Sequence, residues 1–190
     1  MRRALFAAAV ACVAIASETA ALQQTKPAAP APTPAGPVVV FTTVKGVIEI
    51  ETFPADAPKS VERFLDLAKR GFYRGCRFHW VQPAVVQVGD QLTRDMTKRE
   101  SWGTGGSGPG QSARPIGVFE AGKRPIQRGT VGLAYRNGWK PETADSQIFI
   151  MKVANPELNG KYAVLGRVIR GMEVVDKIQR DDMIKEVAVK

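Results

Sequence analysis

The feature that most constrains the fold is a series of short β-type runs between residues 38 and 189, each bounded by turn residues. In one run, Ile48 and Ile50 alternate with Glu49 and Glu51, which is the pattern of a strand with one buried face. Many short strands of this kind favour a mainly β domain. The runs predict eight strands, at 38–43, 47–52, 77–81, 84–88, 130–135, 147–153, 163–169 and 184–189.

Two helices are expected beside the strands. Residues 56–58, Asp-Ala-Pro, predict a helix start with an acidic N-cap and an early proline, and residues 69–71, Lys-Arg-Gly, predict its end. Residues 171–178 predict a second, shorter helix. The Gly-, Ser- and Pro-rich segment 93–128 predicts an extended surface loop. Apolar residues recur at the spacing of one face of the first helix: Val61, Phe64, Leu65 and Ala68.

The N-terminus has the pattern of a secretory signal peptide. Residues 1–3, Met-Arg-Arg, are followed by an uncharged apolar run over 4–16, which is too short to span a bilayer. We therefore assign residues 1–17 to a signal peptide and expect an exported protein, periplasmic or secreted. Two alternatives stay open, namely lipidation at Cys12 and an uncleaved signal anchor.

Composition bounds the remaining organisation. Residues 18–37 are rich in Pro and Ala, which favours an extended linker, so the folded domain is expected at 38–190. The formal net charge of +9 is spread along the chain and is not interleaved with aromatics, which argues against a nucleic-acid groove. We expect a monomer that touches a membrane only through an N-terminal anchor.

Several kinds of catalytic site can be set aside. His79 is the only histidine, so a Ser-His-Asp or Cys-His site would have to use it. No His and Cys cluster suggests a metal site. The glycine-rich segment 103–110 lacks the Gly-Lys-Ser/Thr ending of a phosphate loop. Cys76 would be alone after signal-peptide cleavage, so no disulfide is expected.

The order of short motifs in the domain resembles that of the cyclophilins, over about residues 39–178. The resemblance implies a closed antiparallel β-barrel of eight strands with two flanking α-helices. It also implies peptidyl-prolyl cis-trans isomerase activity on proline-containing polypeptides, without a metal or cofactor. The motifs that carry it are Phe53-Pro54, residues 57–61, Gly71-Phe72-Tyr73, Phe78-His79, residues 87–90, residues 146–150, Gly160-Lys161, residues 165–169 and residues 171–178.

The same resemblance assigns the catalytic positions. Trp80 stands where the family carries an arginine that hydrogen-bonds at the prolyl amide. An indole has a single donor and no charge, so it cannot replace a guanidinium fork. Gln87 matches the glutamine that orients the substrate backbone. One residue is missing before it, so either Val85 or Val86 is expected to line a shallower pocket, and we assign Val86.

Further residues match the family's substrate contacts. Tyr135 replaces an asparagine, Tyr162 stands where many members carry histidine, and Glu157 stands where many carry tryptophan. Arg136 is a candidate for a replacement guanidinium. Without the motif order, Gln147 and Phe149 would be interpreted as one face of a packed strand. The predicted substrate-binding residues are Val86, Ala134, Tyr135, Gln147, Phe149, Leu158 and Tyr162.

Three functional hypotheses follow. The first is an exported isomerase of Xaa-Pro bonds with weakened activity, because Trp80 replaces the family arginine. The second is a non-catalytic proline-peptide-binding module or chaperone on the same barrel. The third is a structural or interaction protein tethered through residues 1–37. Rate measurements separate the first from the second, and binding of a proline peptide separates the second from the third.

Overall fold

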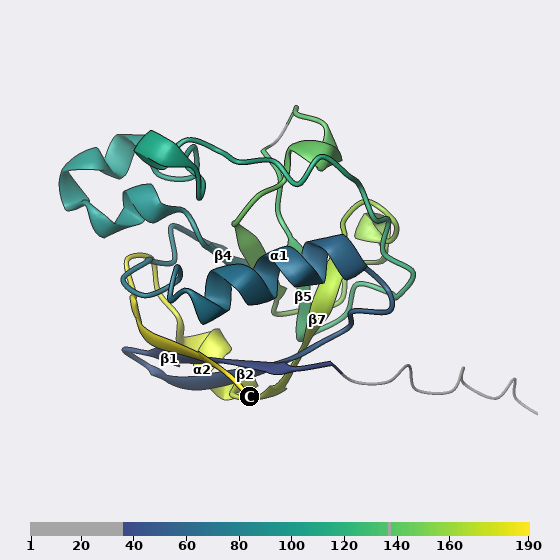
Figure 1. Ribbon diagram of the computed structural model, residues 1–190. Helices are drawn as coiled ribbons and strands as arrows, with labels where there is room; N and C mark the ends of the chain where they lie inside the picture. The colour runs from purple at the N-terminus through teal and green to yellow at the C-terminus, as the bar shows by residue number, and fades with distance from the viewer. Residues whose placement is uncertain (1–35, 137) are drawn as a thin grey trace, which may run out of the picture. The chain divides into compact units, whose positions relative to one another are not determined.

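The computed structural model describes residues 36–136 and 138–190 (Figure 1). The predicted signal peptide at 1–17, and the predicted linker at 18–37 apart from its last two residues, lie outside the described residues. Those two residues already belong to the folded unit, since the Gly36 amide donates to the Thr52 carbonyl at 2.9 Å. The Val38 amide in turn donates to the carbonyl of Lys190 at 3.1 Å. Ordered pairing therefore starts slightly before the expected domain boundary.

The described chain forms one eight-stranded antiparallel sheet, as predicted. Its strand order is β3-β4-β6-β5-β7-β2-β1-β8. Every neighbouring pair is antiparallel. The strands are β1 (Val38–Thr43), β2 (Gly46–Thr52), β3 (Trp80–Val81), β4 (Val85–Val88), β5 (Thr130–Leu133), β6 (Ile148–Met151), β7 (Val164–Arg170) and β8 (Ile184–Val189).

The curled sheet is closed at its two edge strands by irregular pairing. Instead of a ladder between β3 and β8, a single antiparallel bridge joins Arg77 to Met183. Two hydrogen bonds flank this bridge, from the Phe78 amide to the Asp182 carbonyl at 2.9 Å and from the Ile184 amide to the Cys76 carbonyl at 3.0 Å. The predicted strand at 77–81 is thus mostly bridge, and regular strand covers only its last two residues.

Helix α1 (Pro58–Lys69) lies across the sheet (Figure 1), but its start differs from the prediction. The N-cap is Ala57 without a side-chain hydrogen bond, because the carboxylate of Asp56 pairs with Arg124 instead. Glu120 supplies the missing acceptors from the long loop. Its two carboxylate oxygens accept from the Lys59 and Ser60 amides at 3.0 and 2.8 Å. The first amides of α1 are therefore capped by a residue distant in sequence and not by a neighbouring side chain.

The end of α1 and the second helix follow the prediction. Gly71 has φ +68, so the chain leaves α1 through a left-handed residue. Helix α2 (Met172–Lys177) begins after Gly171, whose φ is +89. A Cβ atom at Gly171 would lie 2.1 Å from the carbonyl oxygen of Val47. Only glycine therefore fits where α2 meets β2.

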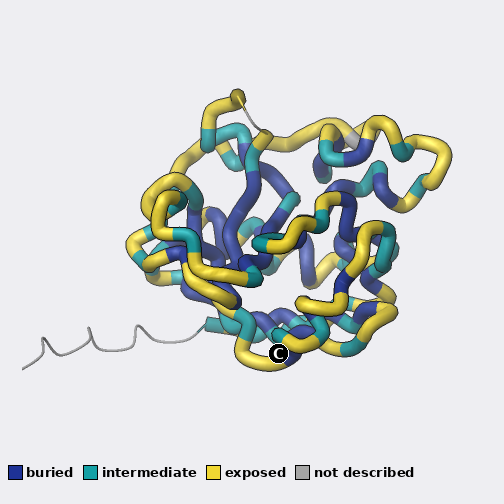
Figure 2. Tube along the Cα trace, turned by 180° about the vertical axis from the view of Figure 1, so that it is seen from behind, coloured by how far each residue is buried: buried dark blue, intermediate teal, exposed yellow. Residues whose placement is uncertain are grey.

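The core fills the interior of the sheet beneath α1 (Figure 2). On α1 the buried side chains include Phe64 and Leu67, whereas the predicted Leu65 is only half-buried. The rings of Phe41, Phe64 and Tyr73 pack together with centroid distances of 5.3 to 6.3 Å. Cys76 is fully buried and free, and burial raises its pKa to about 11.

The segment predicted as an extended surface loop is partly structured and anchored. It holds three short 3₁₀ helices, η1 (Gln91–Arg94), η2 (Met96–Ser101) and η3 (Pro109–Gln111). Two further 3₁₀ turns follow later, η4 (Pro141–Thr143) and η5 (Pro156–Leu158). The fully buried Asp90 carboxylate accepts from the Leu92, Gly103 and Gly105 amides at 2.8, 2.6 and 3.1 Å. The loop is therefore tied to the end of β4.

Candidate active site

A cavity of about 990 Å³ lies on the outer face of β4, β6 and the end of β5. The alternation of side chains along these strands explains its lining. Val85 and Gln87 of β4 face the cavity, whereas Val86 and Val88 are fully buried in the core. On the neighbouring strand, Phe149 faces the cavity.

The floor of the cavity is apolar. Phe149 and Met151 of β6 are buried in a small cluster of their own, with Leu158 and Tyr162 packed against it. The rings of Phe149 and Tyr162 meet edge to face with centroids 5.0 Å apart. This cluster, separate from the main core, gives the cavity a wall suited to a compact apolar ring.

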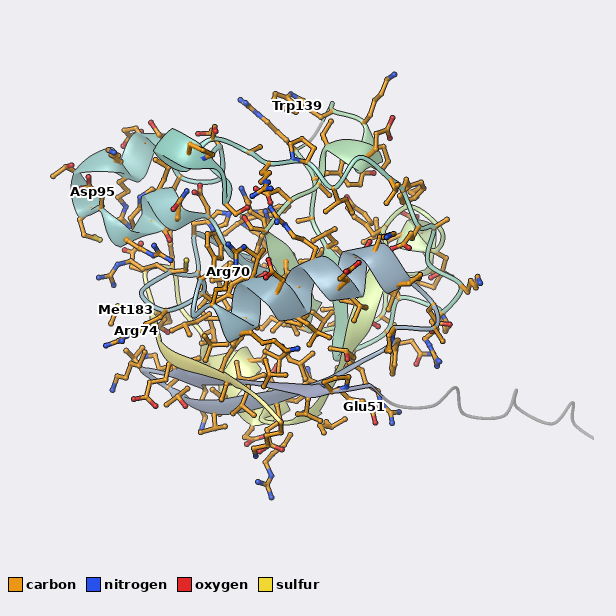
Figure 3. The ribbon with its side chains drawn as sticks, in the orientation of Figure 1. Glu51, Arg70, Arg74, Asp95, Trp139 and Met183 are labelled. Carbon is orange, nitrogen blue, oxygen red and sulfur yellow. The ribbon has the colours of Figure 1, made fainter. Side chains whose placement is uncertain are left out.

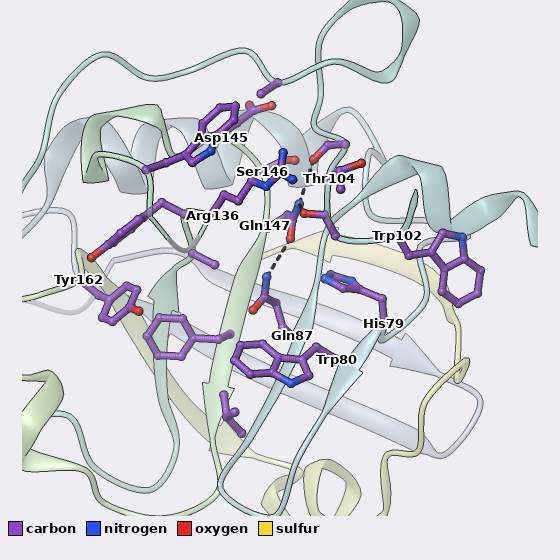
Figure 4. Close-up of a pocket in the computed structure, with 18 of the residues that line it drawn as sticks. His79, Trp80, Gln87, Trp102, Thr104, Arg136, Asp145, Ser146, Gln147 and Tyr162 are labelled. Atoms are coloured by element: carbon purple, nitrogen blue, oxygen red, sulfur yellow. Dashed lines mark hydrogen bonds between the residues drawn. The ribbon is translucent and has the colours of Figure 1, made fainter. Parts of the chain in front are cut away.

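A pair of amide side chains runs along the cavity beside this floor (Figure 4). Nε2 of Gln87 donates to Oε1 of Gln147 at 2.8 Å. Nε2 of Gln147 donates to the carbonyls of Gly103 and Gly105 at 3.0 and 2.9 Å. Gln147 therefore fixes both the loop wall and Gln87. No hydrogen bond within the described residues uses Oε1 of Gln87, which is therefore available to a ligand.

Trp80 lies at the edge of the cavity, on β3. It pairs directly with Gln87 across the β3–β4 ladder, so the two side chains leave the sheet side by side. Its side chain is 50% exposed, which is unusual for a residue of this size and apolarity. Figure 4 shows the indole next to Gln87. At this position the protein therefore offers a flat apolar surface and one N–H donor.

Aromatic and cationic side chains surround the opposite side of the cavity. The Tyr135 and Tyr162 rings lie 4.9 Å apart, and the Tyr135 hydroxyl donates to the Lys161 carbonyl at 3.2 Å. Burial, reinforced by Tyr135, raises the pKa of Tyr162, so its phenol is neutral at physiological pH. The guanidinium of Arg136 stacks on the Trp139 ring at 5.3 Å.

His79 lies in the cavity wall, and within the described residues neither of its ring nitrogens has a hydrogen-bond partner. Burial lowers its pKa below the ordinary 6.5, which favours the neutral imidazole. A Cβ atom at Gly103 would lie 3.6 Å from its Nε2, so the loop covers the ring closely. This close packing favours a structural role for His79.

Asp145 lines the cavity but is not free to act. It is 5% exposed and pairs with Arg63 at 2.6 Å. It also accepts from the Ser107 amide and hydroxyl, each at 2.6 Å, and from the Arg114 amide at 2.9 Å. With four donors around one carboxylate, Asp145 anchors the loop to α1 and contributes no free charge to the cavity.

The structure brings almost all predicted site residues together. Val86 is the exception and the assignment was wrong, because its side chain is fully buried in the core and Val85 lines the cavity instead. Glu157 is exposed and not part of the lining, whereas Arg136 is. The predicted residues that line the cavity are Trp80, Gln87, Ala134, Tyr135, Gln147, Phe149, Leu158 and Tyr162.

Some lining residues were not identified from the sequence. Met151 continues the outward alternation of Gln147 and Phe149, which is a pattern that could have assigned it. Trp102, Trp139 and Arg180 come from loops, where no periodicity indicates the direction of a side chain.

No group of three or more His, Cys, Asp or Glu side chains in 36–136 and 138–190 is arranged to hold a metal ion. Among the helices of the same ranges, none is long and apolar enough to cross a membrane.

Residues 38–190 match the family described as cyclophilin type peptidyl-prolyl cis-trans isomerase/CLD. A probable peptidyl-prolyl cis-trans isomerase of Brucella abortus is 38% identical over 153 residues, covering 80% of this chain and 76% of the relative. Peptidyl-prolyl cis-trans isomerase B of Bacillus subtilis is 34% identical over 142 residues, covering 75% and 90%.

Solved structures agree with the sequence comparison. A crystal structure of a cyclophilin-type isomerase of Cryptosporidium parvum superimposes with a TM-score of 0.66 at 25% identity, covering 81% of this chain and 97% of that one. A Cryptosporidium parvum structure in the presence of the dipeptide Ala-Pro gives the same TM-score at 24% identity, covering 80% and 98%.

Proposed function

This chain belongs to the cyclophilin-type peptidyl-prolyl cis-trans isomerases, and from that premise we propose that it isomerises Xaa-Pro bonds in proteins outside the cytoplasm, with an activity lowered by Trp80. The observation that carries the proposal is the position of the apolar floor around Phe149 directly beside the Gln87–Gln147 amide pair. A substrate offers a matching pair of groups, because an apolar proline ring lies directly beside the polar amide that precedes it.

The reaction sets what the cavity has to do. Rotation about the prolyl amide faces a barrier of roughly 18–20 kcal/mol and takes on the order of tens to hundreds of seconds without a catalyst. Phe149, Met151 and Leu158 can hold the proline ring, while Gln87 binds the neighbouring backbone. Holding both sides of the bond favours the twisted amide over the two planar ones. The reaction needs no covalent step and no proton transfer.

Trp80 is the reason to propose a lowered activity. In the twisted amide the nitrogen lone pair is no longer delocalised, so a fixed donor at that nitrogen stabilises the transition state. The indole can give one uncharged hydrogen bond, whereas a guanidinium gives several charged ones. Loss of one preorganised donor costs about a hundred- to a thousandfold in rate elsewhere.

The test compares wild type with Trp80→Arg on a neutral Ala-Pro peptide, in a kcat/KM assay of isomerisation. We expect measurable wild-type activity and a rise of about a hundredfold in the variant, because Oε1 of Gln87 can orient a guanidinium at the paired position. Trp139→Arg is the matched control. Trp139 is 51% exposed, and its replacement adds the same charge on the other side of the cavity. We expect no comparable gain from it.

The other outcomes separate the remaining hypotheses. An inactive wild type with an active Trp80→Arg variant would make the protein a proline-peptide binder on a competent fold. Inactivity of both, together with no binding of the peptide, would contradict the proposal and favour an interaction protein.

Export is the second part of the proposal, and it rests on the sequence. The basic residues 1–3, the apolar run 4–16 and the Pro- and Ala-rich linker 18–37 support it. Fractionation of cells that express the full chain, followed by N-terminal mass analysis, tests it. A mature chain that begins shortly after residue 17 in the exported fraction is expected. An uncleaved cytoplasmic chain would contradict it.

A further inference from the structure

We propose that the cavity selects proline-containing segments that carry carboxylate side chains beside the Xaa-Pro bond, and that Arg136 and Arg180 bind those carboxylates. The inference rests on the proposed isomerase function and names its substrate class.

The charges that line the cavity are unbalanced. Its charged lining residues are Arg136, Arg180 and Asp145, together with the neutral His79. Asp145 is almost fully buried and already accepts from Arg63, Ser107 and Arg114. The charges that a ligand would meet are therefore both positive. A cavity lined with one sign of charge attracts the opposite sign.

Arg136 is available to a ligand. Its guanidinium stacks on the Trp139 ring, and within the described residues it forms no ion pair. Figure 4 shows it extended beside Ser146. Seven other arginines of the described chain are paired with carboxylates, as Arg167 is with Glu51 at 2.8 Å. Stacking on an indole holds a guanidinium in place and leaves its N–H groups free to bind a carboxylate.

Arg180 is presented by a fixed turn on the other side of the cavity. Its neighbour Asp181 has φ +78, which is uncommon for a residue with a Cβ atom. Arg77 donates to the Asp181 carbonyl at 2.9 Å, and Arg99 pairs with the Asp181 carboxylate at 2.6 Å. The Asp181 amide donates to the Phe78 carbonyl at 3.0 Å. These contacts hold the backbone of Arg180 beside the start of β3.

The charge of Arg180 also reaches the cavity wall. It acts with burial to lower the pKa of His79. No hydrogen bond or ion pair of Arg180 itself is found among the residues that the structure describes. It is exposed and lines the cavity, so its guanidinium is accessible to a ligand.

The separation of the two arginines suits a short extended peptide. Arg180 lies beside β3, and Arg136 follows β5, with β4 and β6 between these strands. Three strand spacings amount to about 14 Å, which an extended chain covers with about four residues. A segment with its Xaa-Pro bond over the floor at Phe149 could thus place a carboxylate near either arginine.

The experiment uses three peptides, Ala-Zaa-Ala-Pro-Zaa-Ala with Zaa as Glu, Gln or Lys. For each we would measure kcat/KM of isomerisation and, separately, binding by tryptophan fluorescence, at low and at high ionic strength. At low ionic strength we expect kcat/KM and affinity to be higher for the Glu peptide than for the Gln peptide, by about two- to fivefold for each arginine. The Lys peptide should be the poorest, and salt should reduce the differences.

Variants assign the preference to the two arginines. Arg136→Gln and Arg180→Gln should each lower the ratio of kcat/KM for the Glu peptide to kcat/KM for the Gln peptide. The double variant should bring this ratio near one. Arg74→Gln is the matched control, because Arg74 is exposed, lies outside the cavity lining and is well separated from Trp139 (Figure 3). It should keep the wild-type ratio.

The two readouts separate the possible failures. Charge selection would be overturned, with the isomerase function left standing, if kcat/KM were equal for the Glu and Gln peptides. It would also be overturned if Arg74→Gln lost the preference for the Glu peptide as fully as the cavity variants. A Glu preference in binding without turnover of any peptide would contradict the isomerase function alone. Neither turnover nor preference would overturn both.

Discussion

At the scale of single residues, a Cβ atom at position 132 would lie 2.2 Å from Cζ of Phe149, the ring that forms the floor of the cavity. Gly132 of β5 pairs directly with Phe149 of β6, so the far end of the ring lies over a strand position that has no side chain. The floor that we propose for the proline ring therefore depends on the absence of a methyl group at position 132.

We predict that Gly132→Ala displaces Phe149, weakens binding of an Ala-Pro peptide and lowers stability by about 1–3 kcal/mol. Val131→Ala is the control, because Val131 lies on the same strand but points into the core. It should lose stability through a small cavity and retain binding. Urea unfolding and fluorescence titration measure both properties. Equal peptide affinity in the two variants would contradict this role of Gly132.

His79 allows a second test at this scale, because it is the only histidine of the chain. Burial lowers its pKa in the folded state below the ordinary 6.5. Between the folded and unfolded values the unfolded chain binds more protons, so the free energy of unfolding rises with pH there. As pH falls through 6.5, stability is lost, and the loss ends below the folded pKa.

We predict that His79→Gln removes this pH dependence, whatever its effect on stability at neutral pH. Urea unfolding across the range from pH 5 to 7.5 would show a slope for wild type and a flatter line for the variant. The same slope in both proteins would show that His79 is not the group responsible.

At the scale of elements, the long segment between β4 and β5 contains three short 3₁₀ helices and is tied to the rest of the domain by buried carboxylates. Asp90 binds three of its backbone amides, and Asp145 binds two more positions and Arg63 of α1. Gln147 adds the carbonyls of Gly103 and Gly105. One wall of the cavity therefore depends on polar contacts over long sequence separations.

We predict that Asp145→Ala lowers the free energy of unfolding by about 3–5 kcal/mol, because it leaves the largely buried Arg63 charge without a counter-charge and the Ser107 and Arg114 amides without an acceptor. Asp66→Ala removes a carboxylate from the exposed pair with Arg70, which are 51% and 55% exposed, and should cost less than about 1 kcal/mol. Urea unfolding of both variants measures the difference. Similar losses would mean that Asp145 acts as a surface residue.

These contacts also mark what local sequence could predict. The eight strands and both helices followed from periodicity and turn residues, because those patterns act over a few neighbouring positions. The cap on α1 from Glu120 and the order of the loop did not, since each depends on residues distant in sequence. Val86 was misassigned although the relevant pattern is local. Alternation counted back from Gln87 places Val85 on the same face as Gln87 and Val86 on the core face.

At the scale of the whole molecule, the two faces of the sheet have different roles. The inner face carries the main core, while the outer face of β4, β6 and β5 carries the cavity. The motif order identified the family and most of the outer residues. Loop residues such as Arg180 and Trp139 reach the cavity only through the folded arrangement, so no local pattern could assign them.

The proposed function requires that the wild-type protein accelerates rotation about Xaa-Pro bonds. The most direct measurement is magnetisation exchange between the cis and trans proline resonances of an Ala-Pro peptide, with catalytic amounts of protein. We predict exchange that rises in proportion to protein concentration, well above the uncatalysed rate of one event in about tens to hundreds of seconds. Exchange that stays at the uncatalysed rate at every protein concentration would contradict the proposed isomerase function.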